Sequence, residues 1–200
     1  MEPIRAFIAI ELPSQIKASL SQLQDTLKKS RSATVKWVDT EGIHLTLKFL
    51  GNVDEGEIPA IDKALSEAVR GVAPFYLELA DPGVFPSFQA PRVVWVGVGG
   101  EIEPLRTLHN SIDRVLTPLG FTPEKRAFSP HLTLGRVRDE ASSAERHRLG
   151  DTVASLKTGE RSSFKVDSLS LMRSRLTREG AIYSRLASLV LGSHETDCAK

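Results

Sequence analysis

Two copies of one tetrapeptide, His-Leu-Thr-Leu, hold the residue types in this sequence that are best suited to chemistry. The first copy spans His44–Leu47, and the second, His131–Leu134, begins 87 residues later. Alternate residues of a strand point to the same side, so each histidine shares a face with the threonine two residues on. We expect the leucines, which point the other way, to anchor each strand while the histidines and threonines face a shared space.

Two imidazoles and two hydroxyls that converge on one cleft suit phosphodiester hydrolysis or transesterification. Histidine has an ordinary pKa of about 6.5, so one ring can be neutral and the other protonated near neutral pH. One ring then acts as general base and the other as general acid, and such assistance is typically about 10²–10⁴-fold. Threonine hydroxyls can donate hydrogen bonds to phosphate oxygens where charge develops. We therefore predict His44 and His131 as catalytic and Thr46 and Thr133 as phosphate-binding residues.

Structural roles and metal binding are the competing interpretations of these residues. A single buried histidine is usually a hydrogen-bonded structural residue, but two such roles would have to arise independently at matched positions. We expect no metal and no cofactor, because no carboxylate stands two residues after either motif histidine and Cys198 is the only cysteine. His109, His147 and His194 are expected to be structural or solvated.

The elements that must position these residues follow the same order in both halves of the chain. In the first half, hydrophobic periodicity predicts strands at 5–12, 36–38, 43–50 and 75–79, helices at 14–29 and 54–72, and a loop at 81–91. In the second half it predicts strands at 92–98, 130–137, 163–172 and 181–191, and helices at 101–119 and 141–157. We expect Ser14 to cap its helix, Gly51 to end its strand and Gly150 to interrupt the last helix. Arg5 and Arg92, which open the first strand of each half, are also 87 residues apart.

A shared offset in two elements indicates a duplicated β-α-β-α-β unit. The expected fold class is α+β, with two pseudo-twofold-related lobes of antiparallel sheet and outer helices around a central cleft. We predict one bilobal catalytic domain over residues 1–192, with repeat units of about 1–88 and 89–192. A disordered tail is expected at 193–200.

The two motif segments resemble the paired His-x-Thr motifs of the 2H phosphoesterase superfamily. These segments read IHLTLKFLG at 43–51 and PHLTLGRV at 130–137. The chain is more closely similar to the RNA 2′,3′-cyclic phosphodiesterases, also called the 2′-5′ RNA ligase-like family, and the resemblance covers most of its length. It extends to RAFIAIELP at 5–13, VKWVDTEGIHLTLKFLGNV at 35–53, GVFPSFQAPRVVWVGV at 83–98 and LMRSRLTREGAIYSRL at 171–186.

This resemblance implies metal-independent hydrolysis of an RNA 2′,3′-cyclic phosphate end to a 2′-phosphomonoester. Some family members also join RNA ends through a 2′-5′ linkage. The family suggests that His44 protonates the leaving 3′ oxygen and that His131 activates water, and it places Arg136 near the phosphate. The residues alone leave the two histidine roles interchangeable. The alternative function is a non-catalytic module that binds an RNA end or a cyclic nucleotide in the same cleft.

Several residues near the motifs have more than one interpretation. Strict alternation places Arg136 on the face opposite His131, and a bulge at Gly135 would bring it to the cleft. Lys48 has the parity of His44, so it either faces the cleft or reaches solvent at the strand end. Tyr183 with Arg173, Arg175, Arg178 and Arg185 either contacts RNA or forms a solvated basic edge, and Phe85 and Phe88 either stack on a base or cap the core.

The charge balance limits the kind of partner. The chain has 26 Lys and Arg against 25 Asp and Glu, a net charge of +1, which favours recognition of an RNA terminus over coating of a long strand. The expected partner is RNA with a 2′,3′-cyclic phosphate end, such as a tRNA fragment, or a small cyclic nucleotide. We expect a cytoplasmic monomer without membrane contact, because no apolar run approaches about 18 residues and the cysteine content fits a reducing compartment.

Overall fold

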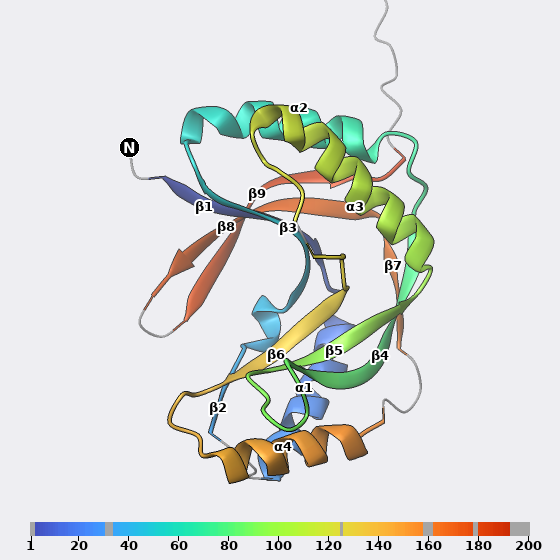
Figure 1. Cartoon of the computed structure of the whole chain (residues 1–200). Helices are drawn as coiled ribbons and strands as arrows, with labels where there is room; N and C mark the ends of the chain where they lie inside the picture. The colour runs from blue at the N-terminus through green and yellow to red at the C-terminus, as the bar shows by residue number, and fades with distance from the viewer. Residues whose placement is uncertain (1–2, 31–33, 125, 158–161, 178–179, 193–200) are drawn as a thin grey trace, which may run out of the picture.

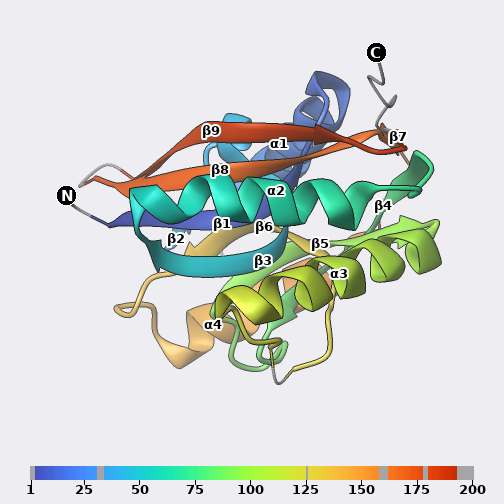
Figure 2. The same ribbon diagram turned by 90° about the horizontal axis from the view of Figure 1, so that it is seen from above.

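Two antiparallel sheets face each other, and helices cover the outer side of each sheet (Figure 1). The computed structural model describes residues 3–30, 34–124, 126–157, 162–177 and 180–192. The helices are α1 (Ser14–Lys29), α2 (Ile58–Val69), α3 (Ile102–Leu116) and α4 (Ser143–Ser155). Figure 2 shows α2 running over the first sheet with α3 beside it. The predicted α+β class with two facing sheets and outer helices is confirmed.

The sheets contain four and five strands. The first sheet has the order β3-β1-β8-β9 and is built from β3 (His44–Val53), β1 (Ile4–Glu11), β8 (Ser168–Leu176) and β9 (Ala181–Val190). The second has the order β2-β6-β5-β4-β7 and is built from β2 (Val35–Trp37), β6 (His131–Val137), β5 (Val93–Gly100), β4 (Phe75–Phe85) and β7 (Ser163–Val166). Their neighbouring strands are all antiparallel.

The motif leucines anchor both histidine strands in one apolar core, as expected. Leu45, Leu47, Leu132 and Leu134 are all buried. The helices contribute their periodic apolar faces to the same core, since a stripe of residues three or four apart faces the sheet. This burial leaves only the opposite face of each histidine strand open to the space between the sheets.

The two halves of the chain exchange elements. Strands β1 and β3 lie in the first sheet, but the next long strand, β4, joins the second sheet beside β5. In the same way β5 and β6 lie in the second sheet, while β8 joins the first sheet beside β1. Helix α1 follows β1 yet contacts the second sheet, where the side chain of Gln24 donates hydrogen bonds to the carbonyls of Val38 and Leu134. Neither sheet is therefore built from one half of the sequence.

The offset in residue number between the two repeats is not the same for all strands and differs by one residue. His44 pairs with Glu11 on β1, and His131 pairs with Gly97 on β5, so the paired strands correspond at an offset of 86 while the histidines correspond at 87. The expected equivalence of Arg5 and Arg92 is therefore wrong by one residue. The cause is a connection between the paired strands that is one residue longer in the second half.

Several strand boundaries differ from the prediction. Gly51 does not end β3, because its positive φ of 75° accompanies a register shift and the strand continues to Val53. Strand β4 includes residues 81–85, which were expected in a loop, because residues 82–85 pair with β5. The strand expected over 163–172 is two strands, β7 and β8, and these pair in different sheets.

Two helix details also differ from the prediction. Helix α1 begins at Ser14 with Pro13 as its N-cap, so Ser14 is not the cap. Gly150 does not interrupt α4, which runs through it. A glycine is needed at this point because the helix packs closely against the backbone of Phe88. A Cβ atom on Gly150 would lie 1.8 Å from the carbonyl oxygen of Phe88.

The predicted tail at 193–200 lies outside the described residues. Within the described ranges, no helix combines the length and the apolar character that a membrane crossing requires.

Candidate active site

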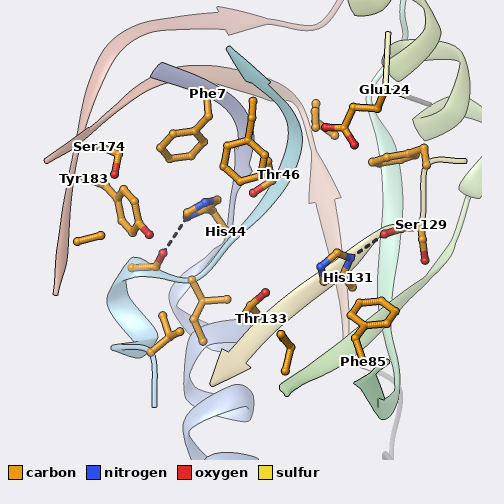
Figure 3. A pocket seen from close by; sticks show the side chains of 18 of the residues that line it. Phe7, His44, Thr46, Phe85, Glu124, Ser129, His131, Thr133, Ser174 and Tyr183 are labelled. Carbon is orange, nitrogen blue, oxygen red and sulfur yellow. Dashed lines mark hydrogen bonds between the residues drawn. The ribbon is translucent and has the colours of Figure 1, made fainter. Parts of the chain in front are cut away.

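One cavity of 1020 Å³ contains all four motif side chains (Figure 3). His44 and Thr46 reach it from β3, and His131 and Thr133 reach it from β6. The structure therefore brings together the two motifs from opposite sheets, as their spacing indicated. All four side chains are half-buried, which leaves each of them accessible from the cavity.

Each histidine strand has a β-bulge directly after its motif threonine. On β3, Thr46 pairs with Ala9 and Lys48 with Ile8, so Leu47 has no partner on β1. On β6 the unpaired residue is Leu134. A bulge inserts one extra residue, so every later side chain points to the opposite face from that expected by strict alternation.

The bulges decide where two candidate cations lie. Arg136 lines the cavity, because the bulge at Leu134 returns it to the face of His131. The bulge is one residue before the expected position at Gly135. Lys48 turns away from the cavity for the same reason. The expectation that it shares a face with His44, which rested on strict alternation, is therefore wrong.

Lys48 is instead part of a buried ion pair between β3 and α3. Its side chain is only 3% exposed, and its Nζ donates to Asp113 Oδ1 at 2.5 Å and to the carbonyl of Thr122 at 2.9 Å. A charge in the core is tolerated only when it is paired and hydrogen-bonded, and both conditions are met here. This lysine joins β3, α3 and the segment that follows α3.

The two histidines are held by equivalent backbone hydrogen bonds. The Nδ1 atom of His44 lies 2.8 Å from the carbonyl oxygen of Gly42, and Nδ1 of His131 lies 2.7 Å from that of Ser129. A carbonyl oxygen can only accept, so Nδ1 carries a hydrogen in each ring. Nε2 is then the nitrogen that can exchange a proton: it accepts one in the neutral ring and donates one in the protonated ring.

His44 lies in an aromatic enclosure built from the first sheet. Its ring stacks on Phe7 at a centroid distance of 4.6 Å and meets Tyr183 edge-on at 4.9 Å. This burial lowers the pKa of His44, and the hydrogen bond to Gly42 and the charge of Glu11 oppose the shift only in part. Burial therefore favours the neutral form of the His44 ring.

The arginines expected to cluster with Tyr183 do not lie together with it in the structure. Tyr183 lines the cavity, but Arg185 is bound to Glu11 through two hydrogen bonds of 2.7 and 2.9 Å. This ion pair lowers the pKa of Glu11. Arg173 and Arg175 alternate with cavity-lining residues of β8 and so point to the opposite face. Arg178 lies outside the described residues.

A second aromatic group surrounds His131 from the other sheet. Phe85 meets the His131 ring edge-on at 5.2 Å and packs on Trp95 at 5.0 Å. Phe85 is 36% exposed and lines the cavity, so it does more than cap the core. Phe88 is not among the lining residues described, and its backbone packs against Gly150.

Some cavity residues were not identified from the sequence. His109 lines the cavity and stacks on Phe128 at 4.1 Å, although it was expected to be structural or solvated. Glu124 and Arg126 reach the cavity from the same segment after α3. Phe49 lies at the rim, 60% exposed, five residues after His44, where the other strand has Arg136. Of these residues, only Phe49 could have been found from the sequence, because it stands at the same distance after its motif as Arg136 does.

Among the residues that the structure describes, no three His, Cys, Asp or Glu side chains are grouped so that they could hold a metal ion.

A repeated His-x-Thr motif that faces itself across one cavity between two antiparallel sheets defines a 2H phosphoesterase. The chain belongs to the 2′-5′ RNA ligase superfamily, whose sequence profile matches residues 12–178.

Relatives and solved structures agree with this membership. The RNA 2′,3′-cyclic phosphodiesterase of Methanothermobacter thermautotrophicus is 40% identical over 181 residues, covering 90% of this chain and 95% of the relative. That of Aeropyrum pernix is 37% identical over 167 residues, covering 84% of this chain and 92% of the relative. The crystal structure of apo E. coli LigT superposes with a TM-score of 0.76 at 28% identity, covering 96% of this chain and all of LigT. LigT was also solved in complex with 3′-AMP, and that structure matches equally well at a TM-score of 0.76.

Proposed function

We propose that this cavity hydrolyses RNA 2′,3′-cyclic phosphate ends to 2′-phosphomonoesters by general acid–base catalysis with His44 and His131. One observation carries the proposal. Both histidines enter one cavity with Nδ1 held by a backbone carbonyl, which leaves Nε2 of each ring for proton transfer. The relatives named as RNA 2′,3′-cyclic phosphodiesterases, which match most of the chain, support a cyclic RNA end as the substrate.

The reaction divides into two proton transfers at the phosphorus atom. The neutral histidine takes a proton from water as the water oxygen attacks phosphorus. The protonated histidine gives its proton to the 3′ oxygen as the bond between that oxygen and phosphorus breaks. The products are a 2′-phosphate and a 3′-hydroxyl, and proton exchange with solvent restores both rings. With a 5′-hydroxyl of a second RNA in place of water, the same transfers would form a 2′-5′ linkage.

The remaining polar groups of the cavity suit the charge that develops on the phosphate. Thr46 and Thr133 follow their histidines on the same strand faces, so their hydroxyls can donate to the nonbridging oxygens. Arg136 supplies the positive charge from β6. Donors fixed in place before the reaction need no rearrangement when charge builds up, which is why they stabilise the transition state.

The aromatic side chains suit the nucleoside part of the substrate. Phe49 presents an exposed ring at the rim of the cavity, on the strand opposite Arg136. A nucleobase stacked on an aromatic side chain gains about 1–3 kcal/mol. The complex of LigT with 3′-AMP supports the view that a cavity of this shape accepts a nucleotide. The phosphate and the base are then bound by opposite sheets.

The decisive experiment uses a short RNA that ends in a 2′,3′-cyclic phosphate, incubated with the protein in EDTA. Phosphorus NMR identifies the position of the phosphate in the product. A 2′-phosphate is expected, and its formation in EDTA would establish the metal-independent reaction. An unchanged substrate would contradict the proposal and favour the non-catalytic binding module, which retained binding of the same oligonucleotide would then reveal.

A further inference from the structure

Lys36 and Arg136 lie directly opposite each other on neighbouring strands of the second sheet. The register of β2 and β6 pairs them, so their side chains project from the same face. The neighbouring pair, Trp37 and Gly135, faces the other way, and the side chains of Trp37 and Val35 lie where a Cβ on Gly135 would be. Lys36 therefore shares the cavity-facing side of the sheet with Arg136.

This pair of cations is not neutralised within the described part of the protein. Both side chains are exposed, and neither forms an ion pair with a described carboxylate. The nearby acidic side chains are engaged elsewhere: Asp39 accepts from the backbone N–H of Glu41, Glu41 pairs with Lys17, and Glu140 pairs with Arg138. Like charges directly opposite on a sheet are unfavourable, so this arrangement favours an anion that can lie between them.

The position of the pair indicates which anion that is. Arg136 lines the cavity that holds the histidines, whereas Lys36 lies on β2, the edge strand of the sheet, one strand further out. A polyanion that leaves the cavity past Arg136 would meet Lys36 next. The two cations thus continue the phosphate-binding face of β6 toward the rim.

We propose that Lys36, next to Arg136, binds the internal phosphodiester that precedes the cyclic phosphate in an RNA strand. The inference rests on the proposed function and makes it more specific: the preferred substrate is an oligonucleotide end, and a mononucleoside cyclic phosphate lacks the group that Lys36 binds.

The test compares a tetranucleotide and a mononucleotide that both carry a 2′,3′-cyclic phosphate. We expect Lys36→Gln to lower the ratio of kcat/KM for the tetranucleotide to that for the mononucleotide about fivefold, as for the loss of one exposed ionic contact. Tetranucleotide affinity should also become less salt-dependent, with a slope smaller by about 0.7 for one lost phosphate contact. The matched control is Lys63→Gln, an exposed lysine on α2 without an ion pair among the described residues, which should leave the ratio and the slope unchanged.

Binding measured without turnover separates this inference from the proposed function. Fluorescence anisotropy of a labelled tetranucleotide ending in a 2′-phosphate gives the affinity directly. Equal ratios and equal affinities in the wild type and Lys36→Gln would overturn the role of Lys36 and leave the hydrolysis proposal intact. Weaker binding by Lys36→Gln, with no hydrolysis of either substrate by the wild type, would overturn the hydrolysis proposal and retain the phosphate contact.

Discussion

At the scale of single residues, the two histidines have the same attachment but different surroundings. Each ring is fixed by a carbonyl two residues earlier, so the chemistry of each depends on Nε2. The burial of His44 between Phe7 and Tyr183 makes protonation of this ring costly. Sequence identity between the two motifs therefore does not make the two histidines equivalent.

Substitution of either histidine should remove most of the activity while the protein stays folded. We expect His44→Ala and His131→Ala each to lower kcat/KM by about 10²–10⁴-fold, the usual contribution of a general acid or base. His147→Ala is the control, because this histidine is exposed on α4. Full activity in either motif variant would contradict the two-histidine mechanism.

The same two variants can assign the acid. A substrate with sulfur at the bridging 3′ position needs no proton on its leaving group, because a thiol is far more acidic than an alcohol. If His44 is the acid, as the family resemblance suggests, this substrate should restore activity to His44→Ala and not to His131→Ala. The reverse pattern would exchange the two roles.

The motif threonines should act through their hydroxyls. We expect Thr46→Ala and Thr133→Ala to weaken transition-state binding by about 1–3 kcal/mol, the value of a hydrogen bond to a charged group, which is a fall in kcat/KM of roughly 5–150-fold. Thr→Ser at the same positions keeps the hydroxyl and should retain most activity. Serine variants as impaired as the alanine variants would show that packing of the methyl group is what matters.

The lowered pKa of His44 should depend on Tyr183. Removing this ring by Tyr183→Ala admits water, so the pKa of His44 should rise toward its ordinary value of about 6.5. In the wild type, the folded state binds fewer protons than the unfolded state between the lowered pKa and about 6.5. Acidification through this window therefore costs stability, and less so in Tyr183→Ala. NMR titration of the His44 ring measures the shift, and an unchanged midpoint would show that Tyr183 does not contribute to it.

At the scale of elements, the two bulges are supported by polar groups from the helices. The carbonyl of Leu134, the bulged residue of β6, accepts hydrogen bonds from the backbone of Val38 and from the buried side chain of Gln24 on α1. On the first sheet, Lys48 follows the bulge and is bound by Asp113 of α3. Each helix thus stabilises a local irregularity that orients groups of the cavity.

Gln24→Leu should therefore destabilise the protein although it makes the core more apolar. The change removes the side-chain donor to the carbonyl of Val38, while the carbonyl of Leu134 keeps only its hydrogen bond from the backbone N–H of Val38. An unsatisfied buried polar group costs about 1–3 kcal/mol. We expect the free energy of unfolding, measured by urea denaturation, to fall by this amount. Gln22→Leu, at an exposed position of the same helix, is the control and should have little effect. Equal stability of both variants would show that the Gln24 hydrogen bonds are dispensable.

At the scale of the whole molecule, the exchange of strands makes the two halves depend on each other. Without β8, β1 has only one partner strand, and without β4, β5 loses the strand that pairs along most of its length. An isolated half would leave apolar strand faces exposed to water, which is unfavourable. The same exchange places one histidine on each side of a cavity that neither half encloses alone.

This interdependence predicts that fragments 1–88 and 89–192 do not fold separately. We expect each fragment to give the circular dichroism and NMR spectra of an unfolded chain, and an equimolar mixture to recover folded structure and activity. The intact chain should unfold in one cooperative transition, because the two sheets share strands from both halves. A fragment that folds alone would contradict the prediction of one domain over residues 1–192.

The sequence by itself determined that the four motif side chains could reach a shared cavity and that they come in two sets. Alternation in a strand is a local property, so His44 and Thr46 had to share a face, and the repeat at His131 indicated a second set. The helices and most strands followed from periodicity in the same way, because burial of one face imposes a pattern on neighbouring residues.

Only the tertiary structure decided the bulges and the remote partners. Whether a strand accommodates an extra residue depends on its neighbour and on hydrogen bonds from elsewhere, as with Gln24 and the carbonyl of Leu134. That choice turned Arg136 toward the cavity and Lys48 away from it. The ring of Phe7 beside His44 comes from β1, which pairs with β3, and that of Tyr183 comes from β9, which lies two strands beyond β1 in the same sheet. Such contacts join residues far apart in the chain, so no local pattern of residue types encodes them.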